Sequence, residues 1–243
     1  MTTLASILVA VILAAAAGSP RSRMQAPSGD AAYTEAMSKG DELLMRREYI
    51  QALQAFRRAD ALYVALHERT SPEANLSMAR ALRALKLPRD IVQACDAGLK
   101  YSIESKRLEA NLRNFRGEAL LALATTADDP KLKDAEADLR ASIALSDAMP
   151  MARYNLGLAL LKQRRDDEGV QALRAYLDVA GPSTDAEEAR RLIDNPRRAR
   201  QLGAADVLLK PAPSGAITGL LHRFLTGNPT SPVHSAVVHS DVR

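Results

Sequence analysis

A small residue recurs along this chain at a nearly constant interval, and this repetition constrains the fold more than any single motif does. The intervals are 39, 38 and 40 residues, and the positions are occupied by Gly40, Ala79, Gly117 and Gly157. A leucine follows three residues after each of them. Because glycine within a helix costs about 1 kcal/mol of propensity, its return predicts that a neighbouring helix passes too close for a larger side chain. The sequence therefore predicts four closely packed units of one kind.

Each unit is expected to be a pair of helices. In the first unit, the polar residues Arg46–Tyr49 separate one apolar-periodic run from a second that contains Leu53 and Phe56. The chain has no Trp and only 4% aromatic residues, although 47% of its residues are hydrophobic. A core made mainly of Ala and Leu favours helix over strand. Since one helical hairpin cannot bury both of its apolar faces, at least three must stack.

The fourth and first units resemble the tetratricopeptide repeat. Tyr154–Gln163 looks like the first helix of that repeat, and Glu48–Phe56 looks like its turn and second helix. The resemblance implies an all-α fold, a right-handed superhelical stack of helix-turn-helix repeats. Residues 33–194 are then the repeat domain, with about four hairpins and a capping helix over Glu187–Ile193 that ends before Asn195-Pro196.

Two units depart from the pattern of the family. The second has Ile91 where the family prefers Ala, and the third has a polar loop, Thr125–Asp134, between its two helices. The interval of 38–40 residues is also longer than the usual ~34. Longer second helices or longer loops between units account for the difference, and other helical-hairpin repeats have nearly the same interval.

The two ends of the chain differ from the repeats in composition. Residues 1–17 resemble a signal peptide, since the uncharged stretch Leu4–Ala17 is too short for a ~30 Å hydrocarbon core. We expect cleavage near Ala17 and a periplasmic or secreted protein. The alternative is a membrane anchor formed by an uncleaved signal, because Met1-Thr2-Thr3 carries no Lys or Arg. Residues 18–32 are expected to form a flexible spacer, and residues 195–243 a basic, poorly ordered tail with six Lys or Arg against two Asp.

Catalytic, metal and nucleotide motifs are missing from the sequence. It has no Gly-rich phosphate loop and no Cys-x-x-Cys, and His67-Glu68 lacks the second histidine of a zinc motif. The single thiol, Cys95, lies on an apolar helix face and is expected to be buried and inert. The basic tail has no aromatic platforms for nucleic acid. We therefore expect a protein that is not an enzyme, with no cofactor, no metal and no nucleic-acid partner.

The resemblance implies that the first helix of each hairpin lines a concave groove, which holds a segment of a partner protein. The polar first-helix positions are Arg80, Arg83, Asn111, Asn114, Tyr154, Asn155 and Lys162. Asn155 matches an asparagine that some family members use to hold a peptide carboxylate. The lysines and arginines that complete that clamp are absent, so a chaperone-tail receptor is not supported. The alternative interpretation is that these residues are solvated helix faces.

Three functions remain open from the sequence. The first is a non-catalytic scaffold or adaptor that binds a protein or peptide through Arg-to-carboxylate contacts in the groove. The second is the repeat half of a truncated periplasmic enzyme with a thioredoxin-like domain. The third is self-association of the repeat array through an exposed end.

Overall fold

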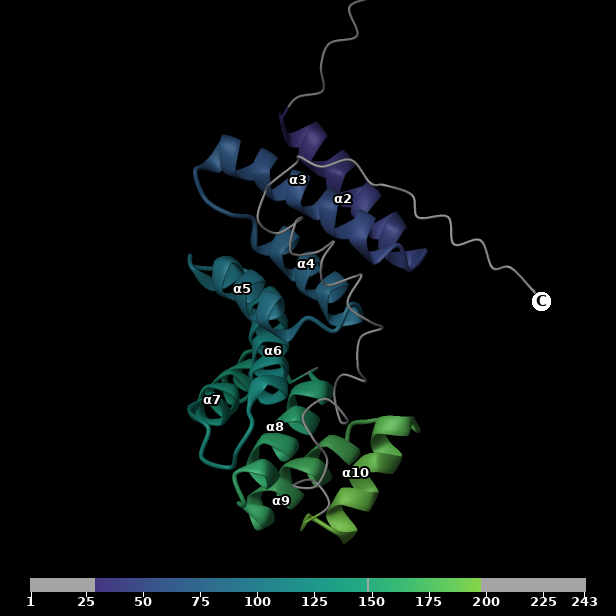
Figure 1. Ribbon diagram of the computed structural model, residues 1–243, viewed down its shortest axis with the longest axis vertical. Helices are drawn as coiled ribbons and strands as arrows, with labels where there is room; N and C mark the ends of the chain where they lie inside the picture. Colours follow the sequence, from purple (N-terminus) through teal and green to yellow (C-terminus); the bar gives the residue numbers. More distant parts are fainter. Residues whose placement is uncertain (1–28, 148, 198–243) are drawn as a thin grey trace, which may run out of the picture.

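The computed structural model describes residues 29–147 and 149–197, and every regular element in this part of the chain is an α-helix. The helices follow one another along the long axis of an elongated molecule (Figure 1). Their bounds are α2 (Gly29–Met45), α3 (Tyr49–His67), α4 (Pro72–Ala84), α5 (Pro88–Leu99), α6 (Lys106–Leu123), α7 (Pro130–Leu145), α8 (Pro150–Lys162), α9 (Asp166–Leu177) and α10 (Thr184–Asp194). The predicted all-helical fold is confirmed. The predicted signal peptide, most of the spacer and the tail from residue 198 lie outside the described residues.

The helices pack as four consecutive hairpins, α2/α3, α4/α5, α6/α7 and α8/α9, and α10 packs on α9. Each second helix also packs against the first helix of the next hairpin. First helices of adjacent hairpins touch directly, from α2 to α4, α4 to α6 and α6 to α8, whereas second helices of adjacent hairpins make at most isolated contacts within the described residues. The first helices therefore form one continuous side of the stack.

The recurring small residues lie where the two helices of one hairpin come closest. A Cβ atom added to Gly117 would lie 2.7 Å from Cγ of Leu139, and one added to Gly40 would overlap the ring of Phe56. Both contacts join the first helix of a hairpin to its own second helix. A neighbouring helix does approach closely at these glycines, but it is the second helix of the same unit, so the expectation that neighbouring units meet at this point is wrong.

Three of the four hairpins turn in the same way. Arg47, Lys86 and Arg164 have φ of 62°, 61° and 62°, and each lies seven residues after the small residue of its unit. In each turn the next residue donates its N–H to the carbonyl of the recurring leucine: Glu48 to Leu43 at 2.9 Å, Leu87 to Leu82 at 3.1 Å, and Arg165 to Leu160 at 3.0 Å. This is the six-to-one hydrogen bond that closes a helix with a left-handed residue. The recurring leucine thus also marks the end of the first helix.

The third hairpin has the expected polar loop, but the loop is shorter than predicted. Helix α7 already begins at Pro130, so residues 130–134 are helical rather than part of the loop. The reason is local, because the Asp129 carboxylate accepts a hydrogen bond from the N–H of Lys131, and proline is favourable in the first helical turn.

The last helix, α10, closes the C-terminal end of the stack. It ends at Asp194, as Asn195-Pro196 predicts, and its N-cap is Ser183, whose Oγ accepts a hydrogen bond from the N–H of Ala186. At the other end, α2 begins at Gly29, four residues before the predicted start of the repeat domain. In residues 29–147 and 149–197, no helix is both long and apolar enough to cross a bilayer.

Candidate partner-binding face

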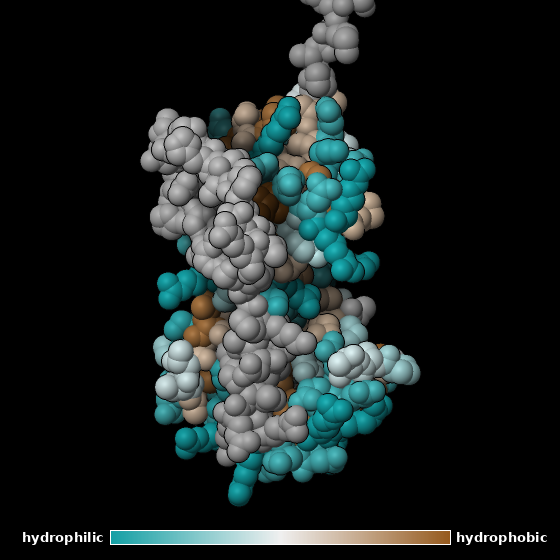
Figure 2. Space-filling model, turned by 45° about the vertical axis from the view of Figure 1, so that its right-hand side comes forward, coloured by the Kyte–Doolittle hydropathy of each residue, from teal (hydrophilic) through white to brown (hydrophobic). Residues whose placement is uncertain are grey.

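The seven residues expected to contact a partner all lie on the first helices α4, α6 and α8, but they differ greatly in exposure. We use the term first-helix face for the side of the stack that carries Arg80, Arg83, Asn114, Glu118, Tyr154 and Asn155. On the side of the molecule drawn in Figure 2, hydrophilic residues cover most of the surface that the described residues present, and hydrophobic residues form small separate patches.

Arg83 and Glu118 form an ion pair between α4 and α6. The Arg83 Nε atom lies 2.9 Å from Oε1 of Glu118, and the Glu118 side chain is only 6% exposed. The Arg83 guanidinium also lies over the ring of Phe115, 5.6 Å from its centroid. Burial raises the pKa of Glu118 above its usual value, although the positive charge of Arg83 opposes the shift. Arg83 is thus already engaged within the chain.

Arg80, one turn before Arg83, is exposed on α4 and forms no ion pair or hydrogen bond with the described part of the chain. Its guanidinium has five N–H donors in a planar arrangement that matches a carboxylate. Among the seven residues considered, Arg80 has the geometry expected of a contact with a partner.

Asn114 and Asn155 join α6 to α8 beneath the surface. Both are buried, and Nδ2 of Asn155 donates to Oδ1 of Asn114 at 3.3 Å. Oδ1 of Asn155 is buried and finds no donor in the described part of the chain. An unsatisfied buried acceptor costs about 1–3 kcal/mol. Because Asn155 is fully covered, it contacts a partner carboxylate only if the face opens at this point.

Lys162 and Asn111 bond to carbonyl groups of the chain itself. Lys162 Nζ donates to the carbonyl of Ala124 at 2.6 Å and lies 3.5 Å from that of Leu121, so the fourth unit caps the C-terminal end of α6 in the third. Burial lowers the pKa of Lys162. Asn111 Nδ2 donates to the carbonyl of Arg107 in its own helix, at 2.7 Å. Lys162 therefore joins two units of the stack, whereas Asn111 bonds only within α6.

Tyr154 leads to a set of acidic groups that the sequence analysis did not identify. Its ring packs against Tyr176 with centroids 5.2 Å apart. Its pKa is raised by burial first, and then by the negative charges of Asp185 and Glu188 on α10. Asp185 also raises the pKa of Glu118, so the negative charge of Asp185 acts on both Tyr154 and Glu118. Register could have identified Glu118, because it follows Gly117 as Arg80 follows Ala79.

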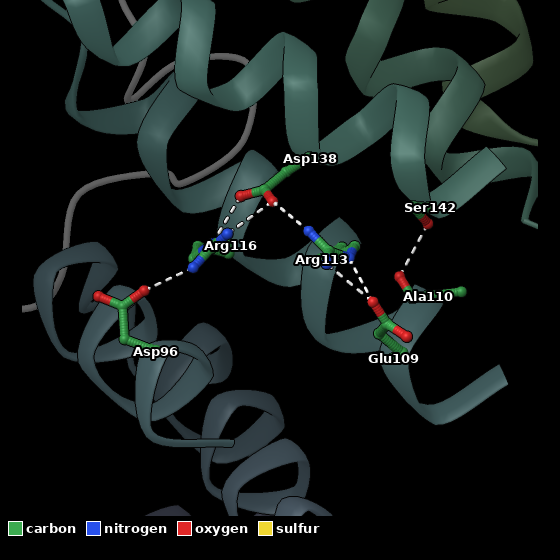
Figure 3. Close-up of polar contacts among 7 residues, drawn as sticks. All are labelled: Asp96, Glu109, Ala110, Arg113, Arg116, Asp138 and Ser142. Atoms are coloured by element: carbon green, nitrogen blue, oxygen red, sulfur yellow. Dashed lines mark hydrogen bonds and ion pairs between the residues drawn. The ribbon is translucent and has the colours of Figure 1, made fainter. Parts of the chain in front are cut away.

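A second charged cluster joins α5, α6 and α7 (Figure 3). The Asp138 carboxylate accepts hydrogen bonds from Nε and Nη2 of Arg116, at 2.6 and 2.7 Å, and Nη1 of Arg116 donates to Asp96 at 2.7 Å. Arg113 lies between Asp138 and Glu109. The hydrogen bonds to Asp138 raise the pKa of Arg116. Beside these groups is an open hollow of about 420 Å³, whose apolar lining includes Val92 and Leu120. Because the charges satisfy one another, this cluster acts as a clamp between two units.

The described residues contain no group of three or more His, Cys, Asp or Glu side chains arranged to hold a metal ion. Cys95 is fully buried, as expected, and burial raises its pKa, which keeps the thiol protonated. No protein-family model, no curated protein and no solved structure matches this chain.

Proposed function

We propose that this chain is a non-catalytic scaffold of the tetratricopeptide kind, which binds an extended segment of a partner protein along its first-helix face. The observation that carries the proposal is the unbroken row of first helices from α2 to α8. Closer contact between first helices than between second helices is what a superhelical stack with a concave first-helix side requires. The right-handed twist is part of this proposal, because it is the twist that the family resemblance implies.

The charges on this face favour a particular kind of segment. Arg80 on α4 forms no ion pair or hydrogen bond with the described residues, whereas the carboxylates lie toward α10: Asp185 and Glu188 are on α10, and Glu118, paired with Arg83, is on α6. A carboxylate of the partner binds Arg80 through paired N–H bonds, and lysines or arginines of the partner lie toward α10. The proposed partner is therefore a protein segment with an acidic group at one end and basic groups at the other.

A second candidate is self-association through the N-terminal end of the stack. A hollow of about 320 Å³ between α2 and α3 has apolar residues in its lining, including Ala36, Leu43 and Ala55, beside Lys39 and Arg58. The opposite end is covered by α10. If copies associate, the pair is expected to join two N-terminal ends about a twofold axis. The repeat half of a truncated thioredoxin-like enzyme is a further proposal with less support, because the sequence contains no Cys-x-x-Cys pair.

The proposed place of action is outside the cytoplasm, in the periplasm or beyond it. Support comes from the apolar stretch Leu4–Ala17, which resembles a signal peptide. In the alternative, the signal peptide is not cleaved near Ala17 and anchors the protein in the membrane. Sequencing the N-terminus of the protein recovered from its native host separates the two forms.

The experiment for the scaffold proposal is site-specific photocrosslinking in the native host. A photoreactive residue replaces Ala84, which is exposed on α4 near Arg80, and in a matched variant it replaces Gln93, which is exposed on the second helix α5. We expect a discrete partner adduct from position 84 and much less from position 93. Equal adducts from both positions would contradict the proposal. Adducts between copies of this chain alone would favour self-association.

A further inference from the structure

The open hollow beside Arg116 and Asp138 is a second candidate binding site, between the second helices α5 and α7. We propose that this hollow binds the side chain of an arginine in a partner protein, and that an apolar residue of the same segment lies in an adjoining hollow near the start of α6. The site is separate from the first-helix face, so this inference does not rest on the function proposed for that face.

The hollow exists because α5 and α7 both pack on α6 but make at most isolated contacts with each other. Its volume of about 420 Å³ lies within the range of about 300–1,000 Å³ that is typical of ligand sites. Val92, Leu120 and Ala137 form the apolar part of its lining, one from each of the three helices, and Ala137 is exposed. The hollow is therefore open to solvent and has walls against which the methylene groups of a long side chain can pack.

The charge of the lining favours a cation. Three aspartates and two arginines line the hollow, so one negative charge is in excess: Asp96, Asp134, Asp138, Arg113 and Arg116. Both carboxylate oxygens of Asp138 already accept hydrogen bonds from the arginines. Asp96 uses only Oδ1, which accepts from Arg116 (Figure 3), and Asp134 is exposed and forms no ion pair or hydrogen bond with the described residues. Acceptor oxygens thus remain open on both α5 and α7.

An arginine side chain matches these features more closely than a lysine does. Its planar guanidinium has five N–H donors in a fork that can reach acceptors on two sides, whereas the lysine ammonium is a compact point charge. The methylene groups of the arginine would pack along Val92, Leu120 and Ala137 while the guanidinium reaches Asp96 and Asp134. A guanidinium in this position would supply the positive charge that the lining lacks.

The adjoining hollow, of about 370 Å³, indicates a protein segment rather than a free small cation. Arg113 lines both hollows, and the second also has apolar side chains in its lining, including Ile103 and the 37% exposed Tyr101. Along α6 the second hollow extends from Glu109 to Arg113 and the first from Arg113 to Leu120, so at 1.5 Å per residue their centres are about 8 Å apart. Extended residues advance about 3.3 Å each. An apolar residue and an arginine two or three positions apart would therefore occupy both hollows.

Binding of short peptides to the full-length protein tests the proposal. The probes are acetyl-Leu-Ala-Ala-Arg-amide and acetyl-Arg-Ala-Ala-Leu-amide, one for each chain direction, and the controls carry citrulline, the neutral analogue of arginine. We expect millimolar binding of one arginine peptide, seen by NMR as shifts of the amide signals of Asp96, Asp134 and Ala137. Shifts that the citrulline peptides reproduce, or no shifts at these residues up to about 20 mM peptide, would overturn the proposal.

Three variants locate the site. Asp134→Asn should weaken binding about threefold, the effect of one exposed ion pair. Asp128→Asn removes an exposed charge from the loop before α7, outside the lining of the hollow, and should leave binding unchanged. Ala137→Phe fills the hollow from an exposed position and should abolish binding while the chain stays folded, as circular dichroism checks. Equal affinity of the folded Ala137→Phe variant and the wild-type chain would overturn the proposal.

Sedimentation of the chain without peptide separates a partner protein from a second copy as the source of the arginine. We expect the same mass for the wild-type chain and for Asp134→Asn. A dimer that Asp134→Asn dissolves would show that a second copy supplies the arginine, and the proposal of a partner protein would be overturned.

Discussion

Gly157 and Leu173 pack so closely that a Cβ atom added to Gly157 would lie 2.6 Å from Cγ of Leu173. The approach continues one turn away, where a Cβ atom on Gly169 would lie 2.7 Å from Cγ of Leu161. Each of these glycines also faces the carbonyl oxygen of the other, at 3.1 Å from the added Cβ atom. Because Gly157 and Gly169 have no side chains, α8 and α9 of the fourth hairpin can pack in close contact at this point.

This packing predicts that Gly157→Ala destabilises the protein. Alanine improves helix propensity by about 1 kcal/mol, but the new methyl group meets the branched carbon of Leu173, and overpacking of this kind costs about 1–3 kcal/mol. We expect a net loss, measured as the free energy of unfolding in urea. Gly181→Ala is the control, since nothing lies within 4 Å of its added Cβ atom. An equal effect at both positions would contradict the packing.

The left-handed turn residues predict a stabilising substitution. Lys86 has φ of 61°, a conformation that costs a residue with a Cβ atom about 1–2 kcal/mol and that glycine adopts freely. Part of this gain is offset because glycine makes the unfolded chain more flexible. Lys86→Gly should therefore raise the free energy of unfolding by about 0.5–1 kcal/mol. Ala84→Gly, inside the last turn of α4, should lower it by a similar amount. Thermal unfolding of both variants checks the opposite signs.

The clamp between the second and third units predicts unequal roles for its two aspartates. Asp138 is nearly buried, with a side chain 5% exposed, and it accepts hydrogen bonds from Arg113 and Arg116. Asp138→Ala leaves both guanidinium groups short of a partner and should cost about 2–4 kcal/mol. Asp96 is 55% exposed, so Asp96→Ala should cost less than about 1 kcal/mol. The free energy of unfolding is measured in urea for both variants. Equal losses would show that the burial of Asp138 does not set its contribution to stability.

The Arg83–Glu118 pair predicts a loss of stability that depends on pH. Burial raises the pKa of Glu118 above its ordinary 4.5, and removal of Arg83 raises it further. A raised carboxyl pKa means that the folded state binds more protons, so its stability falls as pH rises above about 4.5. Arg83→Ala should therefore cost about 1 kcal/mol at pH 7, where Glu118 is charged, and much less at pH 4.

The control for this prediction is the same substitution in a Glu118→Gln background, where the pH dependence should disappear. Urea unfolding at pH 4, 5, 6 and 7 measures all four chains. A loss of equal size at every pH would mean that Arg83 acts through its contact with Phe115 rather than through the charge of Glu118.

The hairpins could be predicted from the sequence because their signals are local and repeat in register. The small residue and the leucine three positions later mark, respectively, the closest approach and the end of the first helix. The start of α7 also had a local signal, since Asp129-Pro130 combines a capping residue with a proline suited to the first turn.

The candidate site was harder to predict because exposure depends on packing between units. Asn155 has a polar side chain at a first-helix position, yet contacts around α8 bury it completely. Lys162 meets its carbonyl partner 38 residues earlier in the chain, and Arg116 meets Asp138 22 residues later. Pairs so far apart in the sequence form because of the way in which the helices and units pack. The periodicity of a single sequence gives no information about that packing.

The most direct test of the account is a crosslinking pull-down of the full-length protein from its native host, comparing Arg80→Glu with Arg89→Glu. Both arginines are exposed, but Arg80 lies on the first helix α4 and Arg89 on the second helix α5. The account predicts that the wild-type chain and the Arg89→Glu variant capture the same partner, and that the folded Arg80→Glu variant loses it. Equal capture by both variants would contradict binding along the first-helix face.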